Sequence, residues 1–132
     1  MARFIIAALC LFCTQASAQT FGLHVGSYHD KPGFNNVNPG AYVRFANGVT
    51  AGFYRNSIDR DSVYVGYTAE RFIGPVGFAV TAGAITGYRH DVLPLLVPSI
   101  KFSHLRLAFI PKAAKGGSGS VHVMLELGTF TF

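Results

Sequence analysis

Two polar segments of this 132-residue sequence carry the residues whose types could do chemistry. One contains His29, and the other runs from Arg55 to Asp61 and includes Asn56 and Ser57. A histidine can take a proton near neutral pH, a serine hydroxyl can attack a carbonyl or position an acceptor, and an asparagine can orient an imidazole or donate to an oxyanion. The aspartates of the second segment could supply a carboxylate. These groups would suit acyl transfer; the alternative is an ordinary polar turn whose Asn and Ser bond the local backbone.

Basic residues are scattered over segments that we expect to be loops. The chain has 11 Lys and Arg against 6 Asp and Glu, a formal net charge of +5. Such side chains could bind the phosphates of a lipid headgroup, or they could be solvated charges. The scatter and the lack of a recognition motif argue against a nucleic-acid partner. The five histidines are isolated in the sequence, so no metal or other cofactor is expected. The basic residues concerned are Lys31, Arg60, Arg89, Lys112 and Lys115.

The elements that must position these residues are strands. Gly, Phe, Val and Tyr outnumber Glu and Lys, which favours β structure over a helical bundle. Apolar residues alternate with small or polar ones, and no segment after residue 18 keeps a helical period over two turns. A shift in this alternation between Leu127 and Phe130 predicts a bulge near Gly128. We expect eight strands, over residues 21–26, 39–46, 49–54, 62–68, 76–84, 95–102, 104–109 and 121–128.

The connections favour a transmembrane barrel over a soluble sandwich, which alternation alone does not distinguish. Tight turns at residues 47–48, 71–74 and 103–104 alternate with longer connections, the pattern of outer-membrane barrels. The strand number is even, and the chain ends on an aromatic residue, which outer-membrane assembly machinery prefers. The expected fold is an all-β, eight-stranded antiparallel transmembrane barrel with its apolar stripe toward lipid. Small inward residues would leave room for a slim ligand such as an acyl chain.

The first 18 residues have the pattern of a cleaved secretory signal peptide. A positively charged start and a short apolar run precede Ala16-Ser17-Ala18, a small-residue cleavage site. The run is shorter than the ~20 residues of a membrane-spanning helix. Both cysteines, Cys10 and Cys13, lie in this segment. We therefore expect export and a single barrel domain over residues 19–132 without a disulfide.

Three prolines mark the strands of the second half. Pro94 and Pro98 lie four residues apart in one expected strand, and Pro111 ends the next. Proline cannot donate to a β ladder, and a missing hydrogen bond in hydrocarbon is costly. One interpretation is a strand start and a strand end. The other is a lateral opening in the barrel wall through which lipid reaches the interior.

Several of these segments together resemble the lipid A palmitoyltransferase (PagP) family of outer-membrane enzymes. The spacing agrees over roughly residues 64–132, and the family's amino-terminal amphipathic helix is missing. The resemblance is carried by Ala82-Gly83-Ala84, the two prolines of the Asp91–Pro98 segment, Ala108-Phe109-Ile110-Pro111, the terminal Phe130-Thr131-Phe132, and the expected outer-loop segments Tyr28–Lys31, Asn35–Gly40 and Arg55–Ser57.

The resemblance implies a barrel that moves an acyl chain from a phospholipid to lipid A. The family's histidine at the end of the first strand would be His29 or His24. Its Asp-Ser pair would be Asn56 and Ser57, so an amide stands where the family has a carboxylate.

We therefore expect an outer-membrane acyltransferase whose catalytic residues are His29, Asn56 and Ser57. Its partners would be membrane phospholipid, lipopolysaccharide and the assembly machinery, and it would act as a monomer. The alternative is a non-catalytic barrel with a surface-modifying, excluding or structural role, and a soluble secreted sandwich is a third interpretation. Substrate would be bound by Arg60, Arg89, Pro94, Pro98 and Pro111.

Overall fold

The computed structural model describes residues 18–88, 92–110 and 119–131, and these residues form eight strands, as predicted. No helix in the described ranges could cross a bilayer. The strands are β1 (Ala18–His29), β2 (Val37–Phe45), β3 (Val49–Arg55), β4 (Asp61–Ile73), β5 (Val76–Ile85), β6 (Leu93–Phe102), β7 (Leu105–Ile110) and β8 (Ser120–Thr131).

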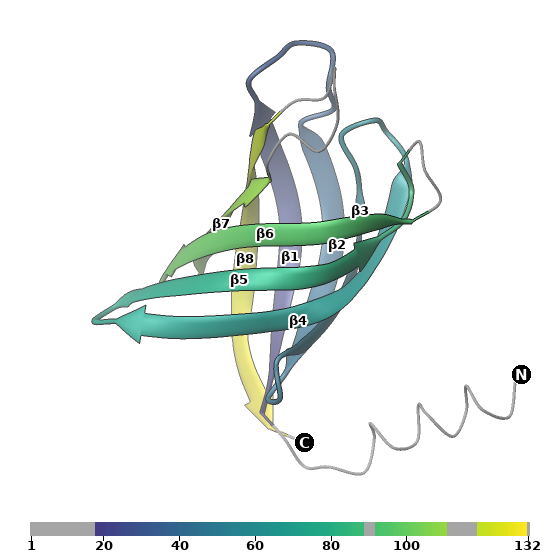
Figure 1. The fold of residues 1–132 in the computed structure, drawn as a ribbon. Helices are drawn as coiled ribbons and strands as arrows, with labels where there is room; N and C mark the ends of the chain where they lie inside the picture. Colours follow the sequence, from purple (N-terminus) through teal and green to yellow (C-terminus); the bar gives the residue numbers. More distant parts are fainter. Residues whose placement is uncertain (1–17, 89–91, 111–118, 132) are drawn as a thin grey trace, which may run out of the picture.

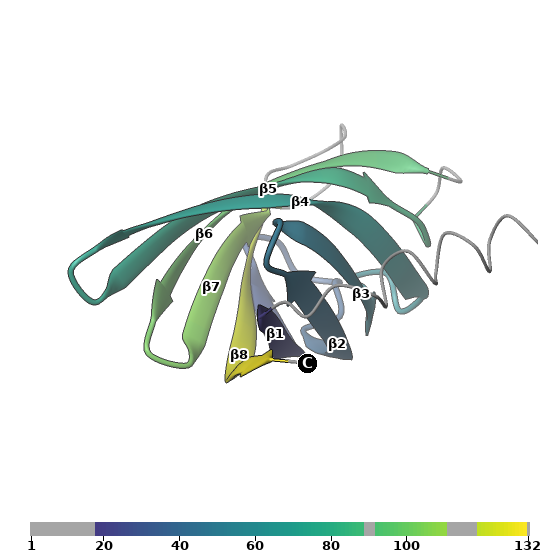
Figure 2. The same ribbon diagram turned by 90° about the horizontal axis from the view of Figure 1, so that it is seen from below.

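Each strand pairs antiparallel with the next, and β8 pairs with β1 to close a barrel. Figure 2 shows the barrel from below, with β8 beside β1. Tight turns join β2 to β3, β4 to β5 and β6 to β7 at one end, which we call the short-turn end. The longer connections lie at the other end, the loop end (Figure 1). The predicted alternation of short and long connections is therefore confirmed, although β4 extends to Ile73 and shortens the second turn.

The apolar stripe of the strands points outward. Residues that pair across neighbouring strands share a face of the sheet, and Val65, Ala84 and Pro94 form one such outward row. The outward side chains make a surface that we call the apolar belt. Its exposed members are Leu23, Val25, Phe53, Val63, Val65, Tyr67, Phe78, Val80, Leu96, Phe102, Leu105, Phe109, Leu125 and Leu127.

A bulge in β8 corrects the phase of the terminal strand. Leu127 is an extra residue between two pairs, Gly22 with Glu126 and Phe21 with Gly128. Gly128 has a φ of 124°, a backbone conformation that side chains rarely adopt. This confirms the predicted bulge near Gly128: Glu126 keeps the inward phase of His122 and Met124, and the alternation shifts after it.

Tyrosine rings fill the space beside the inward glycines. A Cβ at Gly22 would lie 2.2 Å from Cζ of Tyr42, and a Cβ at Gly52 would lie 2.6 Å from Cζ of Tyr64. Both tyrosines are buried and belong to the core of the barrel. The expectation that small inward residues leave room for an acyl chain is therefore corrected here: these residues make room for aromatic side chains.

Replacing Gly22 with alanine is expected to destabilise the barrel by about 1–3 kcal/mol, because the added methyl overpacks the ring of Tyr42. Urea titration of the detergent-folded protein measures the change in unfolding free energy. Gly119→Ala is the matched control, since its Cβ would meet no atom closer than 3.6 Å. Equal stability of the two variants would contradict the packing described for the tyrosine.

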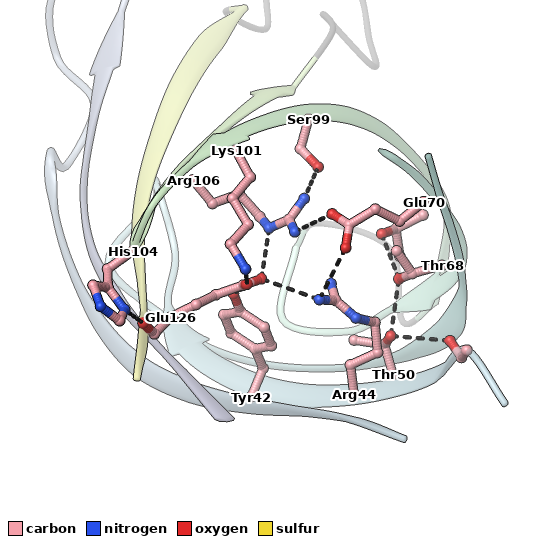
Figure 3. Close-up of polar contacts among 12 residues, drawn as sticks. Tyr42, Arg44, Thr50, Thr68, Glu70, Ser99, Lys101, His104, Arg106 and Glu126 are labelled. Atoms are coloured by element: carbon pink, nitrogen blue, oxygen red, sulfur yellow. Dashed lines mark hydrogen bonds and ion pairs between the residues drawn. The ribbon is translucent and has the colours of Figure 1, made fainter. Parts of the chain in front are cut away.

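A charged cluster closes the interior toward the short-turn end, and we call it the floor cluster (Figure 3). Arg106 donates from Nε to Oε1 of Glu126 at 2.7 Å and from Nη2 to Glu70. The ammonium of Lys101 lies 2.7 Å from Oε2 of Glu126, an ion pair without the alignment of a hydrogen bond. Arg44 approaches both carboxylates at 3.4 and 3.5 Å. The cluster thus consists of Arg44, Glu70, Lys101, Arg106 and Glu126.

Candidate functional site

His29 is the last residue of β1, and its side chain is buried at the loop end of the barrel. A bulge at Val25 makes this possible, because it shifts the register of β1 against both neighbours between His24 and Gly26. Residues five apart in a regular strand face opposite sides. With the extra residue, His24 and His29 are both turned inward, with 7% and 8% of their surface exposed.

Asn36 holds the ring of His29. Nδ1 of His29 lies 2.5 Å from Oδ1 of Asn36, and the ring stacks on Phe34 with centroids 5.1 Å apart. An amide oxygen only accepts, so Nδ1 is the donor in this hydrogen bond, and the lone pair that could take a proton would lie on Nε2. This is the orientation that a general base needs.

Asn56 is fully buried, and its amide is bonded on both sides. Its Nδ2 donates to Oγ of Ser62 at 2.9 Å and to the carbonyl of Gly87 at 2.8 Å. Its Oδ1 accepts from the backbone N–H groups of Ile58 and Arg60, both at 3.0 Å. The amide therefore shapes the β3–β4 loop and ties it to the β5–β6 connection, which favours the polar-turn interpretation of this residue.

Ser57 lies where the first two long loops meet. The N–H of Asn35 donates to its carbonyl at 2.8 Å, so the loop that follows His29 contacts the loop that contains Ser57. Arg60 is exposed on the same loop. An open groove between these loops is lined by Lys31, Pro32, Gly33, Phe34, Asn35, Ser57, Ile58 and Asp59.

In the ranges that the structure describes, strands β6 and β7 are not paired over the first part of β6. Pro94 and Pro98 lie within β6, face outward and are exposed, and β5 pairs with the whole strand. On its other edge, among the described residues, β6 pairs with β7 through residues 99–102, and this pairing ends next to Pro98, which has no N–H to donate. The two strands diverge toward the loop end (Figure 1). Arg89 and Pro111, also named from the sequence, lie outside the described residues.

Below His29 the interior holds a buried histidine pair. Nδ1 of His24 lies 2.8 Å from Nε2 of His122, and Nε2 of His24 lies 2.8 Å from the hydroxyl of Tyr64. His24 also stacks on Tyr54, with ring centroids 4.8 Å apart. His24 therefore belongs to an internal network, and His29 is the histidine of the loop end.

A small cavity lies among these side chains. Its volume is about 70 Å³, and it reaches both strands of the separated wall, through Leu95 and Val97 of β6 and Ala108 and Ile110 of β7. A cavity that binds benzene measures roughly 150 Å³. The interior therefore admits a few water molecules or the end of a chain, and not a complete long acyl chain.

Comparison with known proteins gave no match: no protein-family model fits the chain, and no curated protein is similar enough to be counted as related.

Sequence reasoning did not find Asn36 or His122. Asn36 lies in a polar segment, Asn35-Asn36-Val37-Asn38, whose residue types are those of an ordinary loop. His122 lies at an inward position of β8, and nothing in the sequence distinguishes it there from a residue that merely fills the barrel. The roles of Asn36 and His122 depend on partners elsewhere in the chain. The alternation of β8 predicts that His122 faces inward, but not which residue it meets.

Replacing Asn56 with aspartate is expected to destabilise the loop end by about 1–3 kcal/mol and to leave acyl transfer no faster. The carboxylate would still accept from the two N–H groups, but it would lose the donor to Ser62 and face the carbonyl of Gly87 unpaired. Urea titration gives the first quantity and an acylation assay the second. A gain in activity would instead assign position 56 to the chemistry.

Proposed function

We propose that the protein spans an outer membrane, with the apolar belt against the lipid tails. Soluble proteins rarely expose apolar side chains over so continuous a surface. A closed barrel also satisfies its backbone hydrogen bonds without water, as the hydrocarbon core requires. Phe78 and Phe102 lie near the short-turn end, and Phe53 and Phe109 lie near the loop end, which matches the aromatic girdles of such barrels. In this orientation the loops face outward, and residues 1–18 are the export signal.

We also propose that the loop end transfers an acyl chain from a bilayer phospholipid to lipid A, as the resemblance to the palmitoyltransferase family implies. The observation that supports this most is the setting of His29, a histidine held as a base by Asn36. It lies at the end of the barrel toward which the wall opens between β6 and β7. A lipid ester in the outer leaflet could approach through that opening.

The size of the interior decides where the acyl chain lies. Because tyrosines fill the barrel, we place the chain in the bilayer, along the outward surface of Pro94, Leu96 and Pro98. Only the ester would enter the opening. Arg60 and Lys31 are exposed on the outer loops and would bind lipid phosphates. Ser57, in the groove beside Lys31, would position the acceptor hydroxyl.

The proposed chemistry moves one proton through His29. Nε2 takes the proton of the hydroxyl that attacks the ester, whether that hydroxyl belongs to the acceptor or to a serine of the protein, and its oxygen bonds to the ester carbonyl carbon. The carbon–oxygen bond to the lysophospholipid then breaks, and the leaving oxygen takes the proton back from Nε2. Asn36 keeps the ring in the required tautomer through both steps.

Mass spectrometry of lipid A from Gram-negative cells with and without the protein tests this function. An additional acyl chain on lipid A, lost in a His29→Ala variant that still folds, is the expected result. Lipid A that is unchanged under strong expression of a correctly inserted barrel would reject the transfer reaction.

A non-catalytic barrel is the second candidate, favoured by the structural use of Asn56. That amide bonds Ser62, the carbonyl of Gly87 and two backbone N–H groups, so its hydrogen bonds hold the loops together and none of them goes to His29. This candidate predicts normal insertion into the membrane and no change in any membrane lipid.

A further inference from the structure

A serine lies directly across from His29 on the neighbouring strand. His29 of β1 pairs with Ser120 of β8, and Ser120 pairs with Ile110 of β7. Paired residues share a face of the sheet. His29 is buried at the loop end, and Ile110 lines the interior cavity, so Ser120 lies in the row between the histidine and a residue of that cavity.

The spacing brings the hydroxyl within reach of the imidazole. Side chains of directly opposed residues have Cβ atoms about 4.5–5.5 Å apart, a separation that a serine rotamer can close to hydrogen-bond contact. The strands are tied together at this point, because the N–H of Asp30 donates to the carbonyl of Gly119 at 3.2 Å. No hydrogen bond joins Oγ of Ser120 to another described side chain, and the residue is only partly buried.

We propose that Ser120 is the nucleophile of the acyl transfer and forms a covalent acyl-enzyme. Together with His29 and Asn36 it gives the order hydroxyl, imidazole, amide, which is the arrangement of nucleophile, base and orienting group found in serine and cysteine acyl-transfer enzymes. The proposal rests on the proposed function, and it defines the substrate as a carboxylic ester of a lipid.

Each step balances without a further reactant. Oγ of Ser120 bonds to the ester carbonyl carbon while its proton passes to Nε2 of His29, and the departing alkoxide oxygen takes that proton. The product is an ester between the acyl group and Ser120. An acceptor hydroxyl, or water, then attacks this ester; its proton passes to Nε2 and returns to Oγ of Ser120 as the acyl group leaves.

Ser57 is less well placed for this role. Its contact to the first loop is through its backbone carbonyl, and it belongs to the groove between two loops, not to the row of His29. The two serines therefore have different roles: Ser120 takes the acyl group, and Ser57 lies near the acceptor. Their replacements separate the two roles.

The test is to trap the acyl group. The detergent-folded full chain is mixed with p-nitrophenyl palmitate, the intact protein is weighed by mass spectrometry, and the modified residue is found by peptide mapping. We expect one palmitoyl group on Ser120 and a burst of p-nitrophenolate. Ser120→Ala should remove both and slow turnover by at least roughly 10³-fold. Ser99→Ala is the matched control, because Ser99 faces the same interior but bonds Arg106 in the floor cluster.

The outcomes separate this inference from the proposed function. If Ser120→Ala still acylates lipid A at the rate of the unchanged protein, Ser120 is not the nucleophile, and the proposed transferase function is retained. If Ser120 is acylated while lipid A stays unchanged, Ser120 is the nucleophile, and lipid A is rejected as the acceptor. No acylation of protein or lipid rejects both. Should Ser120→Ala fail to fold, Ser120→Cys keeps a nucleophile of similar size, and absence of an acyl thioester on that folded variant would also overturn the inference.

Discussion

Replacing Glu126 with alanine is expected to destabilise the folded barrel by about 3–5 kcal/mol, the largest effect on stability that we predict. Glu126 is 1% exposed and accepts from Arg106, while Lys101 and Arg44 lie against it. Its removal would leave three cationic side chains, those of Arg106, Lys101 and Arg44, with one fewer partner inside the barrel. Urea titration, with folded and unfolded bands separated by cold electrophoresis, measures the loss.

A second carboxylate of the floor cluster provides the comparison. Glu70 is more exposed than Glu126 and bonds Arg106 and Arg44 only, so Glu70→Ala should cost clearly less. The hydroxyl of Tyr42, which donates to Glu126 at 2.9 Å, loses its acceptor only in the first variant. A loss below about 1 kcal/mol for Glu126→Ala, the range of a surface ion pair, would show that the cluster is solvated and does not close the interior.

Replacing His29 with alanine is expected to lower acyl transfer by about 10²–10⁴-fold while the barrel still folds, because the reaction would lose its general base. Lipid A is analysed by mass spectrometry at matched amounts of inserted protein. Asn36→Asp, which still accepts from Nδ1, should retain most of the activity, whereas Asn36→Ala should lose part of it.

His24→Ala separates the two inward histidines. His24 bonds His122 and Tyr64 in the interior, so its loss should reduce stability and leave the transfer rate of the folded fraction nearly unchanged. If His24→Ala abolished transfer and His29→Ala did not, the loop-end site would be assigned to the wrong histidine.

The strands, and the face of the sheet on which each residue lies, could be predicted because they depend on residues that are neighbours in the sequence. Apolar and small residues alternate along each strand, so the outward stripe can be read from neighbouring positions. The bulge at Leu127 and Gly128 was also predictable, since it shifts the phase of that alternation in the sequence itself. The bulge at Val25 leaves no such trace, because the small residues Gly26 and Ser27 follow it.

The candidate site depends on contacts that no local pattern records. Asn36 bonds His29 because a loop folds back on β1, and Ser120 reaches His29 only because β8 closes the barrel on β1. Asn56 looks like a catalytic position in the sequence, but its amide reaches Gly87, 31 residues away. The small residue Gly22 suggests open space inside the barrel, but the ring of Tyr42, on the next strand, occupies that space. Alternation predicts which face a residue occupies, but not which partner it meets there.

The orientation of the apolar belt is the claim on which the proposed function depends, and tryptophan fluorescence in lipid vesicles tests it most directly. The chain has no tryptophan, so each variant carries a single tryptophan, whose emission is excited selectively above the absorption of the tyrosines. Val65→Trp places it in the apolar belt and Pro32→Trp on an exposed outer loop. We predict that phospholipids with brominated acyl chains quench the emission of Val65→Trp, and that aqueous iodide quenches only Pro32→Trp. Quenching of Val65→Trp by iodide and not by brominated chains would contradict a barrel that lies in a membrane.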